Sequence, residues 1–241
     1  DYTASSSLLM LSVPMETLNS ASLPKYNAQC TWYEGRQYYS VQGQIYTGIT
    51  TILAATRSEE EEQKFKDWEK QVGFAEAQRI RRESTKRGKL LHKQIEGYFN
   101  GSSRAPINQD VEQQNYWQSI QPFLEEIGEA YLVEGNVWHP SGFAGVVDAL
   151  VNYDGQLWVC DWKTSTKLKR WDWIQDHCLQ VAAYTAAINR VYQSQGIRVA
   201  QALIAIALPH TEAQIFRIEQ EELMEYWQIF KQRLAQFKAM Q

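Results

Sequence analysis

The sequence predicts an α/β fold in which a central mixed sheet is flanked by helices. Two segments rich in β-branched and aromatic residues, 143–151 and 156–162, are joined by the pair Asp154-Gly155, a strong signal for a hairpin turn. Helical patterns precede and follow this hairpin. A continuous apolar run, Ala202 to Leu208, is typical of a strand that is buried on both faces of a sheet.

The composition is that of an ordinary globular protein. The 241 residues can bury one good core, with room for an appended subdomain. Hydrophobic residues make up 44% of the chain and charged residues 22%, which excludes an intrinsically disordered protein. Because the net charge is −4, any contact with nucleic acid would have to come from a local basic patch rather than from bulk charge.

The cysteines and the apolar runs bear on the cellular setting. Cys30, Cys160 and Cys178 are odd in number and lack CxxC spacing, which argues against a disulfide framework, a structural zinc site or an iron–sulfur cluster. A reducing, intracellular setting, taken as the cytoplasm, is the simplest fit. The run Leu8 to Val13 is too short to span a bilayer and has no basic flank, so we expect neither a signal peptide nor a membrane anchor.

Residues 1–57 are predicted to form an N-terminal arm and a small hairpin, ahead of a main domain at residues 58–241. Residues 1–29 mix Ser, Thr, Asn and Pro without a period, which indicates a loosely structured arm. Residues 30–39 and 41–49 alternate as strands do, around two glycines, and therefore predict the hairpin.

Two helix starts follow the hairpin. Thr50 or Thr51 is placed to cap a short helix that runs through Ala55. Ser58 precedes four consecutive glutamates, and this predicts a second helix, because a hydroxyl cap and carboxylates in the first turn complement the exposed N–H groups.

Residues 72–99 predict a helix with a break near Ser84-Thr85. Gly88, His92 and Glu96 recur every four residues and share one face, so we count Glu96, on the face that carries His92, among the candidate catalytic residues. A lone histidine on a helix is most often a packing residue, but these neighbours and a basic cluster favour a site. The cluster is either a solvated helix face or a track for phosphates, and it consists of Arg79, Arg81, Arg82, Lys86, Arg87, Lys89 and Lys93.

The second half of the chain alternates helices and strands. In the predicted helix 173–191, Gln180 and Tyr184 lie one turn apart on one face, where they are either packing residues or part of a site. The last helix carries a single apolar stripe, which indicates core packing. The predicted helices are 108–127, 173–191 and 221–240, and the strands outside the central hairpin are 129–139, 202–208 and 214–218.

The central hairpin brings two acidic residues together. If Asp154 and Gly155 are the two loop residues, Asp148 lies directly opposite Asp161, with Cβ atoms roughly 5 Å apart. A longer loop would make the pair diagonal, about 7 Å apart. Lys163 projects from the same face as Asp161 and offers one positive charge against two negative ones. A divalent cation would supply the remainder, and oxygen ligands suit Mg²⁺ or Mn²⁺. The alternative is a pair of solvated strand residues.

Basic residues alternate with tryptophans directly after this hairpin. Lys167, Lys169 and Arg170 are followed by Trp171 and Trp173. This pattern suits a nucleic-acid single strand, because aromatic faces stack on bases while cations hold the backbone. The alternative is a helix-entry loop whose tryptophans are buried.

In this order, the candidate residues resemble the PD-(D/E)xK nuclease superfamily, specifically its RecB-like exonuclease branch. The segment Thr50 to Leu53 is further similar to phage exonucleases and the mitochondrial genome maintenance exonuclease. The resemblance implies a restriction-endonuclease-like core. It rests on four blocks, Gly88-Lys-Leu-Leu-His92, Gly145-Val-Val-Asp148, Asp161-Trp-Lys163-Thr-Ser165 and Gln180-Val-Ala-Ala-Tyr184.

The resemblance implies roles only where residues match. His92, Asp148, Asp161 and the carbonyl of Trp162 would hold the Mg²⁺ or Mn²⁺ ion, and Lys163 would position or activate the attacking water.

Two further residues and two departures complete the comparison with the family pattern. Gln180 and Tyr184 match the Q-x-x-x-Y element and would help to place DNA. Val147 stands where the superfamily name has a proline. The cysteines that bind an iron–sulfur cluster in some relatives have no counterpart here, so we expect no such cluster.

We therefore expect a metal-dependent DNA exonuclease that acts on single-stranded DNA with free ends, as used in DNA repair and recombination, and that has no membrane partner. One alternative is a structure-specific or restriction-like endonuclease on the same core. Another is an inactive nucleic-acid-binding module, against which the presence of Asp148, Asp161 and Lys163 argues. The last is an α/β protein with an incidental aspartate pair.

Overall fold

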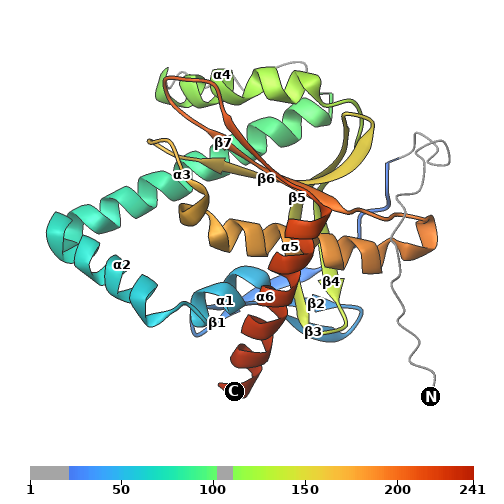
Figure 1. Ribbon diagram of the computed structural model, residues 1–241, viewed down its shortest axis with the longest axis horizontal. Coiled ribbons are helices and arrows are strands. Elements are labelled where there is room, and N and C mark those ends of the chain that lie inside the picture. The colour runs from blue at the N-terminus through green and yellow to red at the C-terminus, as the bar shows by residue number, and fades with distance from the viewer. Residues whose placement is uncertain (1–21, 102–110) are drawn as a thin grey trace.

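A computed structural model describes residues 22–101 and 111–241. The run Leu8 to Val13, most of the predicted arm and the first residues of the predicted helix at 108 lie outside the described residues. Figure 1 shows a twisted sheet with helices on both of its faces. The predicted α/β class, with a central mixed sheet flanked by helices, is confirmed.

The sheet contains eight strands among the described residues, in the order β1-β2-β3-β5-β6-β7-β8, with β4 paired to β5. The pairs β3/β5 and β6/β7 are parallel and the others are antiparallel, so the sheet is mixed. The strands are β1 (Gln29–Tyr33), β2 (Arg36–Val41), β3 (Gln44–Gly48), β4 (Ala130–His139), β5 (Phe143–Tyr153), β6 (Gln156–Thr164), β7 (Gln201–Ala207) and β8 (Gln214–Ile218).

The helices cover the two faces with two separate apolar clusters. One face packs against α1, α5 and α6, and the other packs against α3 and α4. Alternate strand residues enter opposite clusters, as with Val159 and Cys160, because successive side chains of a strand point to opposite faces. The helices are α1 (Ile49–Ala55), α2 (Glu59–Val72), α3 (Phe74–Phe99), α4 (Val111–Glu126), α5 (Gln175–Val191) and α6 (Gln220–Ala239), with short 3₁₀ turns η2 (Trp171–Trp173) and η3 (Gln193–Gln195).

The N-terminal segment contains three strands and not the single predicted hairpin. Each of the pairs Glu34-Gly35 and Gln42-Gly43 forms a two-residue turn with positive φ at both positions, the geometry that suits the twist of antiparallel strands. Because β3 pairs with β5, these strands extend the main sheet. The division of the chain at residues 57 and 58 remains a prediction.

The helix starts were partly predicted. The Ser58 cap of α2 is confirmed, with a reciprocal capping box between Ser58 and Glu61. The threonine cap of α1 was wrong, because the N-cap is Gly48 and the Thr51 hydroxyl accepts a hydrogen bond from the Gln37 amide at 2.8 Å.

The break predicted at Ser84-Thr85 was also wrong. The chain breaks earlier, at Gly73, where a φ of 87° ends α2 and starts α3. Thr85 lies inside the helix, where its hydroxyl donates a hydrogen bond back to the Arg81 carbonyl at 2.9 Å.

The helices α2 and α3 form an arch that projects from the body (Figure 1). No residue of α2 is buried, and from Phe74 to Leu90 only Ala77 of α3 is buried. The C-terminal part of α3 returns to the sheet, where Leu91 and Ile95 are fully buried. The arch is therefore attached to the body at both ends and solvated between them. None of the described helices is long and apolar enough to cross a membrane.

Candidate active site

The site lies where strands β5 and β6 separate. They pair from Tyr153 and Gln156 at the turn to Ala149 and Cys160, in the register predicted from a two-residue loop. Beyond this ladder, β6 continues along β7 while the N-terminal end of β5 pairs with β3. The aspartates Asp148 and Asp161 are the first opposed residues past the end of the ladder.

The separation leaves a backbone donor that Asp148 satisfies. The Trp162 amide donates a hydrogen bond to Asp148 Oδ2 at 2.7 Å, in place of the strand partner that it lacks. Asp148 is 6% exposed and Asp161 is fully buried. Burial raises the pKa of both carboxyl groups, and the positive charge of Lys163 only partly offsets this effect.

Asp161 and Lys163 form an ion pair on one face of β6. Lys163 Nζ donates a hydrogen bond to Asp161 Oδ1 at 2.7 Å. Asp161 Oδ2 also lies 2.7 Å from this nitrogen, but outside hydrogen-bond geometry, so it is a buried acceptor without a hydrogen-bond partner among the described residues. Burial opposes the charged form of Lys163, but Asp161 and Asp148 outweigh it and raise the lysine pKa, which keeps the side chain an ammonium.

His92 of α3 reaches both strands. Its Nε2 lies 2.8 Å from the Trp162 carbonyl oxygen, and its Nδ1 lies 3.4 Å from Glu134 Oε1 and 3.5 Å from Asp148 Oδ1. Burial disfavours the imidazolium, but the carboxylates of Asp148 and Glu134 outweigh burial and raise the His92 pKa to about 9. Both ring nitrogens thus face acceptors, as a cation or a cation ligand requires.

Glu134 is the site residue that the sequence analysis missed. One ligand atom from each of His92, Glu134 and Asp148 lies within 4.8 Å of the others. In the β4/β5 register Glu134 falls opposite Asp148, between the pairs Val133/Ala149 and Gly135/Val147. Its φ of 48° is unusual for a strand residue other than glycine, and such conformations cluster at functional sites. The signal was an acid followed by glycine inside an apolar strand.

Gln180 and Tyr184 of α5 lie against the strand that carries Asp148. Gln180 Nε2 donates a hydrogen bond to the Tyr184 hydroxyl at 3.0 Å, and both side chains are buried. A Cβ atom at Gly145 would lie 2.8 Å from Tyr184 Cε1, so the glycine is required for this close approach. Burial, and then the charges of Asp148 and Asp161, raise the Tyr184 pKa well above its usual range, so the phenol stays protonated.

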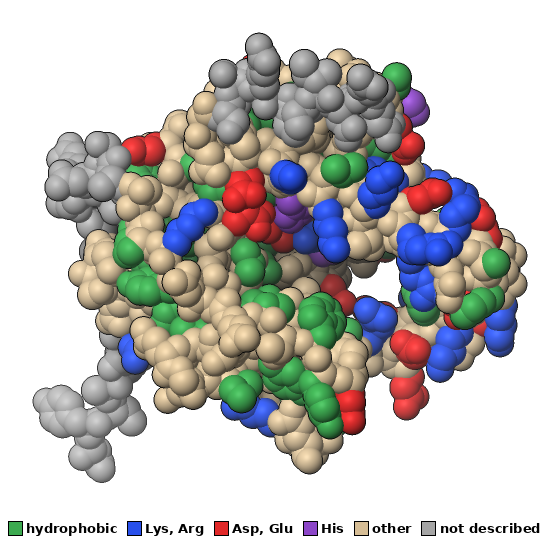
Figure 2. All heavy atoms as spheres, turned by 180° about the vertical axis from the view of Figure 1, so that it is seen from behind, with side chains coloured by type: hydrophobic (Ala, Val, Ile, Leu, Met, Phe, Trp, Pro, Cys, Tyr) green, Lys and Arg blue, Asp and Glu red, His purple; other side chains and the backbone are tan. Residues whose placement is uncertain are grey.

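The pocket beside His92 opens onto the arch. Figure 2 shows acidic, histidine and basic side chains side by side at the edge of an opening between the arch and the body. Glu96 lines this pocket, on the same helix face as His92, which agrees with their predicted spacing. The other lining residues are Gly88, Lys89, Lys93 and Glu134.

Five of the seven residues in the basic cluster of α3 fall into two groups. Arg79 is paired with Glu76 and Glu83, and Arg81 is paired with Glu69, so these two arginines stabilise the arch. The second group consists of exposed lysines that form no ion pair among the described residues; they are Lys86, Lys89 and Lys93.

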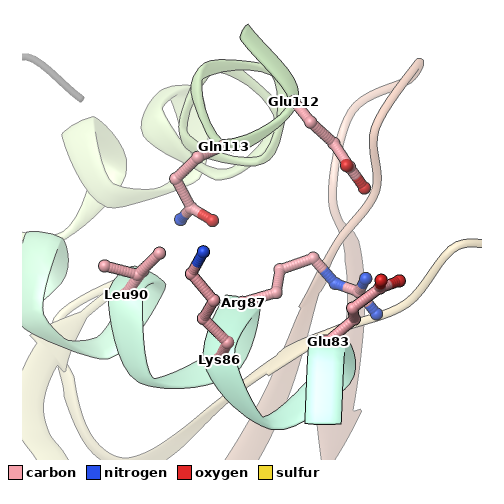
Figure 3. A pocket seen from close by; sticks show the side chains of 6 residues that line it. All are labelled: Glu83, Lys86, Arg87, Leu90, Glu112 and Gln113. Carbon is pink, nitrogen blue, oxygen red and sulfur yellow. The ribbon is translucent and has the colours of Figure 1, made fainter. Parts of the chain in front are cut away.

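Arg87 has a separate, structural set of contacts. It donates a hydrogen bond from Nε to Thr164 Oγ1 at 3.3 Å, and its guanidinium lies 5.0 Å from the centre of the Tyr116 ring. Figure 3 shows its side chain extending toward Glu83 in a pocket between α3 and α4. Arg87 therefore ties α3 to the end of β6, directly after Lys163, while the pocket itself contains none of the predicted site residues.

The donor set fits a divalent metal ion. Carboxylate oxygens, a carbonyl oxygen and an imidazole nitrogen are all ligand types of divalent metal ions, and Asp161 Oδ2, which is ion-paired with Lys163, has no hydrogen-bond partner among the described residues. His92, Asp148 and the Trp162 carbonyl, three of the four predicted ligands, lie together. Asp161 lies outside the cluster formed with Glu134, so its role as a ligand remains a prediction.

Comparison with known proteins gives a family match and several relatives. Residues 58–240 match the model of the PD-(D/E)XK nuclease superfamily. The chain is similar to mitochondrial genome maintenance exonuclease 1 of Mus musculus, with 29% identity over 205 residues, which are 80% of this chain and 59% of that protein. The Homo sapiens protein of the same name is 25% identical over 207 residues, 82% of this chain and 59% of that protein. The chain thus spans about three fifths of the length of these curated relatives.

Among solved structures, the chain is similar to the crystal structure of a proposed exonuclease from Eubacterium rectale. The TM-score is 0.45 and the sequence identity is 15%, over 63% of this chain and 66% of that one.

Proposed function

Because this chain belongs to the PD-(D/E)XK nuclease superfamily, we propose that it hydrolyses phosphodiester bonds of single-stranded DNA from a free end, with Mg²⁺ or Mn²⁺ as its cofactor. The observation that carries this proposal is the grouping of His92, Glu134 and Asp148 beside the Asp161–Lys163 ion pair. The names of the mouse and human relatives, which are exonucleases, favour the same activity.

His92, Asp148, Glu134 and the Trp162 carbonyl would hold the metal ion, and Asp161, whose carboxylate is paired with Lys163, would complete the set. When bound, such an ion supplies a Lewis acid that polarises the phosphate and lowers the pKa of water. Because ligand histidines are neutral, His92 must release a proton to bind the metal.

Lys163 would act on the phosphate and not as a general base. Its raised pKa keeps it protonated, and 23% of its side chain is exposed. Hydrolysis forms a bond between a water oxygen and phosphorus and breaks the bond to one ester oxygen, which leaves with a proton. The ammonium can donate a hydrogen bond to a non-bridging oxygen as negative charge develops there.

The arch supports the preference for a free end. Figure 2 shows an opening that passes between the arch and the body. Since α2 starts from the body after α1 and α3 returns to the sheet, the chain encircles this opening. A strand that runs through it must enter by an end. The exposed Lys86, Lys89 and Lys93 provide positive charge for its phosphates.

A circular substrate tests this function. We expect the protein with Mg²⁺ to shorten a linear, end-labelled single strand and to leave a circular single strand of the same sequence intact. Cleavage of the circle at a similar rate would favour the endonuclease alternative. Absence of cleavage of either substrate with Mg²⁺ or Mn²⁺ would contradict the proposal.

Calorimetry with Mn²⁺ tests the ligand set. Asp148→Asn and Glu134→Gln should each weaken Mn²⁺ binding by at least about tenfold, because each removes a carboxylate from the cluster. Glu129→Gln, just before β4, is the matched control and should bind Mn²⁺ as the unchanged protein does. An unchanged affinity in Glu134→Gln would remove this residue from the site.

A further inference from the structure

Two tryptophans that follow Lys163 in the sequence have exposed side chains, whereas Asp148 and Asp161 are buried. Trp171 is 43% exposed and Trp173 is 56% exposed, which contradicts the interpretation of this segment as a loop with buried tryptophans. In contrast, Trp158 and Trp162 on β6 are almost fully buried. Exposed aromatic rings in a short segment are typical of surfaces that bind a ligand.

The segment that carries these rings is held in one conformation. The Lys169 amide donates a hydrogen bond to Gln214 Oε1 at 2.7 Å, and Gln214 Nε2 donates one to the Lys169 carbonyl at 3.1 Å. The edge of Trp171 packs on Phe216 of β8, with ring centres 4.9 Å apart. Gln175 Nε2 donates a hydrogen bond to the Trp171 carbonyl at 2.8 Å. The rings are therefore preorganised, which lowers the entropy cost of binding.

Two positively charged groups lie over the Trp173 ring. The Arg170 guanidinium is 5.2 Å from the centre of the Trp173 ring, and Lys169 Nζ is 5.9 Å from it. Asp172 fixes Arg170 through two hydrogen bonds, of 2.9 and 2.6 Å. Nucleobases stack on tryptophan and on the plane of a guanidinium, and both groups are available here.

The position of the segment connects it to the opening under the arch. The segment follows the end of β6 and precedes α5. Its residue Arg170 comes seven positions after Lys163 in the sequence. Figure 1 shows that α5 begins on the side of the body that faces α2 and α3. The segment thus lies between the end of β6 and the side of the body that faces the arch.

We propose that Trp171, Trp173 and Arg170 form a stacking platform for unpaired nucleobases of the strand whose backbone is cleaved beside Lys163. The occupant is a single-stranded nucleic acid, favoured over a protein partner by the combination of flat exposed rings with Lys167, Lys169 and Arg170. The course of that strand toward Lys163 rests on the proposed function, whereas base stacking itself does not.

The test separates stacking from contacts with phosphates. Binding of a fluorescein-labelled dT oligonucleotide, about 20 nucleotides long so that it exceeds the site size of one binding module, is measured by anisotropy without divalent metal, so that no cleavage occurs. It is compared with an oligonucleotide of the same length made of abasic nucleotides, which keeps every phosphate. The unchanged protein should bind the strand with bases roughly tenfold more tightly, the effect expected of one stacked base.

Trp173 is the variant of choice because its ring is the more exposed. Trp173→Ala should bind the two oligonucleotides almost equally, and Trp173→Phe should keep most of the difference because it keeps a ring. Trp32→Ala, at a tryptophan that is 67% exposed on the distant strand β1, is the matched control and should keep the full difference. Circular dichroism checks that each variant is folded.

The outcomes distinguish this proposal from the proposed function. If Trp173→Ala keeps the full preference for bases, or binds both oligonucleotides more weakly by the same factor, the platform does not exist. If the preference depends on Trp173 but the protein cleaves no DNA with Mg²⁺ or Mn²⁺, the platform stands and the nuclease assignment fails. If cleavage occurs but the unchanged protein does not discriminate against the abasic strand, only the platform fails.

Discussion

The separation of β5 and β6 and the arch of α2 and α3 are built on opposite principles. At the separation, the acidic side chains are buried, and one, Asp161, is paired with Lys163. In the arch, α2 buries no residue and its ion pairs are exposed. The candidate catalytic side chains therefore lie where tight packing fixes their positions. The element that controls access to them, the arch, packs little against the rest of the fold.

The largest effect should follow a change at the separation. Lys163→Ala removes the ammonium that would stabilise charge on the phosphate, so we expect turnover to fall by about a hundredfold to a thousandfold. Binding of single-stranded DNA should change little, because one partly buried lysine contributes little to a long electrostatic track. Gel assays of end-labelled DNA and anisotropy check the two parts. Unchanged turnover would contradict the assigned role.

Two glycines of the site offer a contrast in stability. Gly145→Ala brings a Cβ atom to 2.8 Å from Tyr184 Cε1 inside the core, and we expect it to lower the free energy of unfolding by about 1–3 kcal/mol. Gly88→Ala is the control on α3, where a Cβ atom meets nothing within 4 Å, and it should be neutral or stabilise by up to about 1 kcal/mol. Urea unfolding followed by circular dichroism measures both. Equal effects would show that the core does not depend on Gly145.

A double change on α3 probes the arch as a phosphate track. Lys89→Gln with Lys93→Gln should weaken DNA binding by about tenfold and lower the slope of log affinity against log salt by roughly 1.4, about 0.7 for each phosphate that is no longer neutralised. The catalytic rate at saturating DNA should be retained. Lys231→Gln, on α6 at the other face of the sheet, is the control. A salt slope that stays the same would argue that these lysines form only a solvated face.

The smallest effect should come from the cap of α2. Ser58→Ala removes the capping box and should cost the helix about 1 kcal/mol. Because α2 buries nothing, we expect faster hydrogen exchange in α2 but almost no change in the midpoint of global unfolding. Ser84→Ala, in the exposed middle of α3, is the control. A clear drop in the global midpoint would show that the arch is coupled to the core.

The same contrast explains what the sequence could predict. A two-residue turn fixes the register of a hairpin, so the opposition of Asp148 and Asp161 followed from Asp154-Gly155 alone. His92 and Glu96 followed from helical spacing. Both relations depend only on residues that are close in the sequence, so the sequence pattern is enough to predict them.

Relations that depend on tertiary structure were not predictable in this way. The sequence around Glu134 shows only an acid followed by glycine inside an apolar strand, which reveals neither its left-handed backbone conformation nor its approach to His92. The Thr51 hydroxyl is used by Gln37 of a neighbouring strand, which no capping pattern reveals. The path of the arch depends on the backbone φ angle at Gly73. The sequence shows a glycine there, but it does not show in which direction the chain turns.

The conformation of Glu134 has a consequence for protein engineering. A designer who moved this constellation to another scaffold and copied only the residue types would obtain a regular strand, without the φ of 48° that Glu134 has here. The backbone irregularity would have to be transplanted with the side chain, because the 3.4 Å contact between Glu134 Oε1 and His92 Nδ1 is made from that conformation.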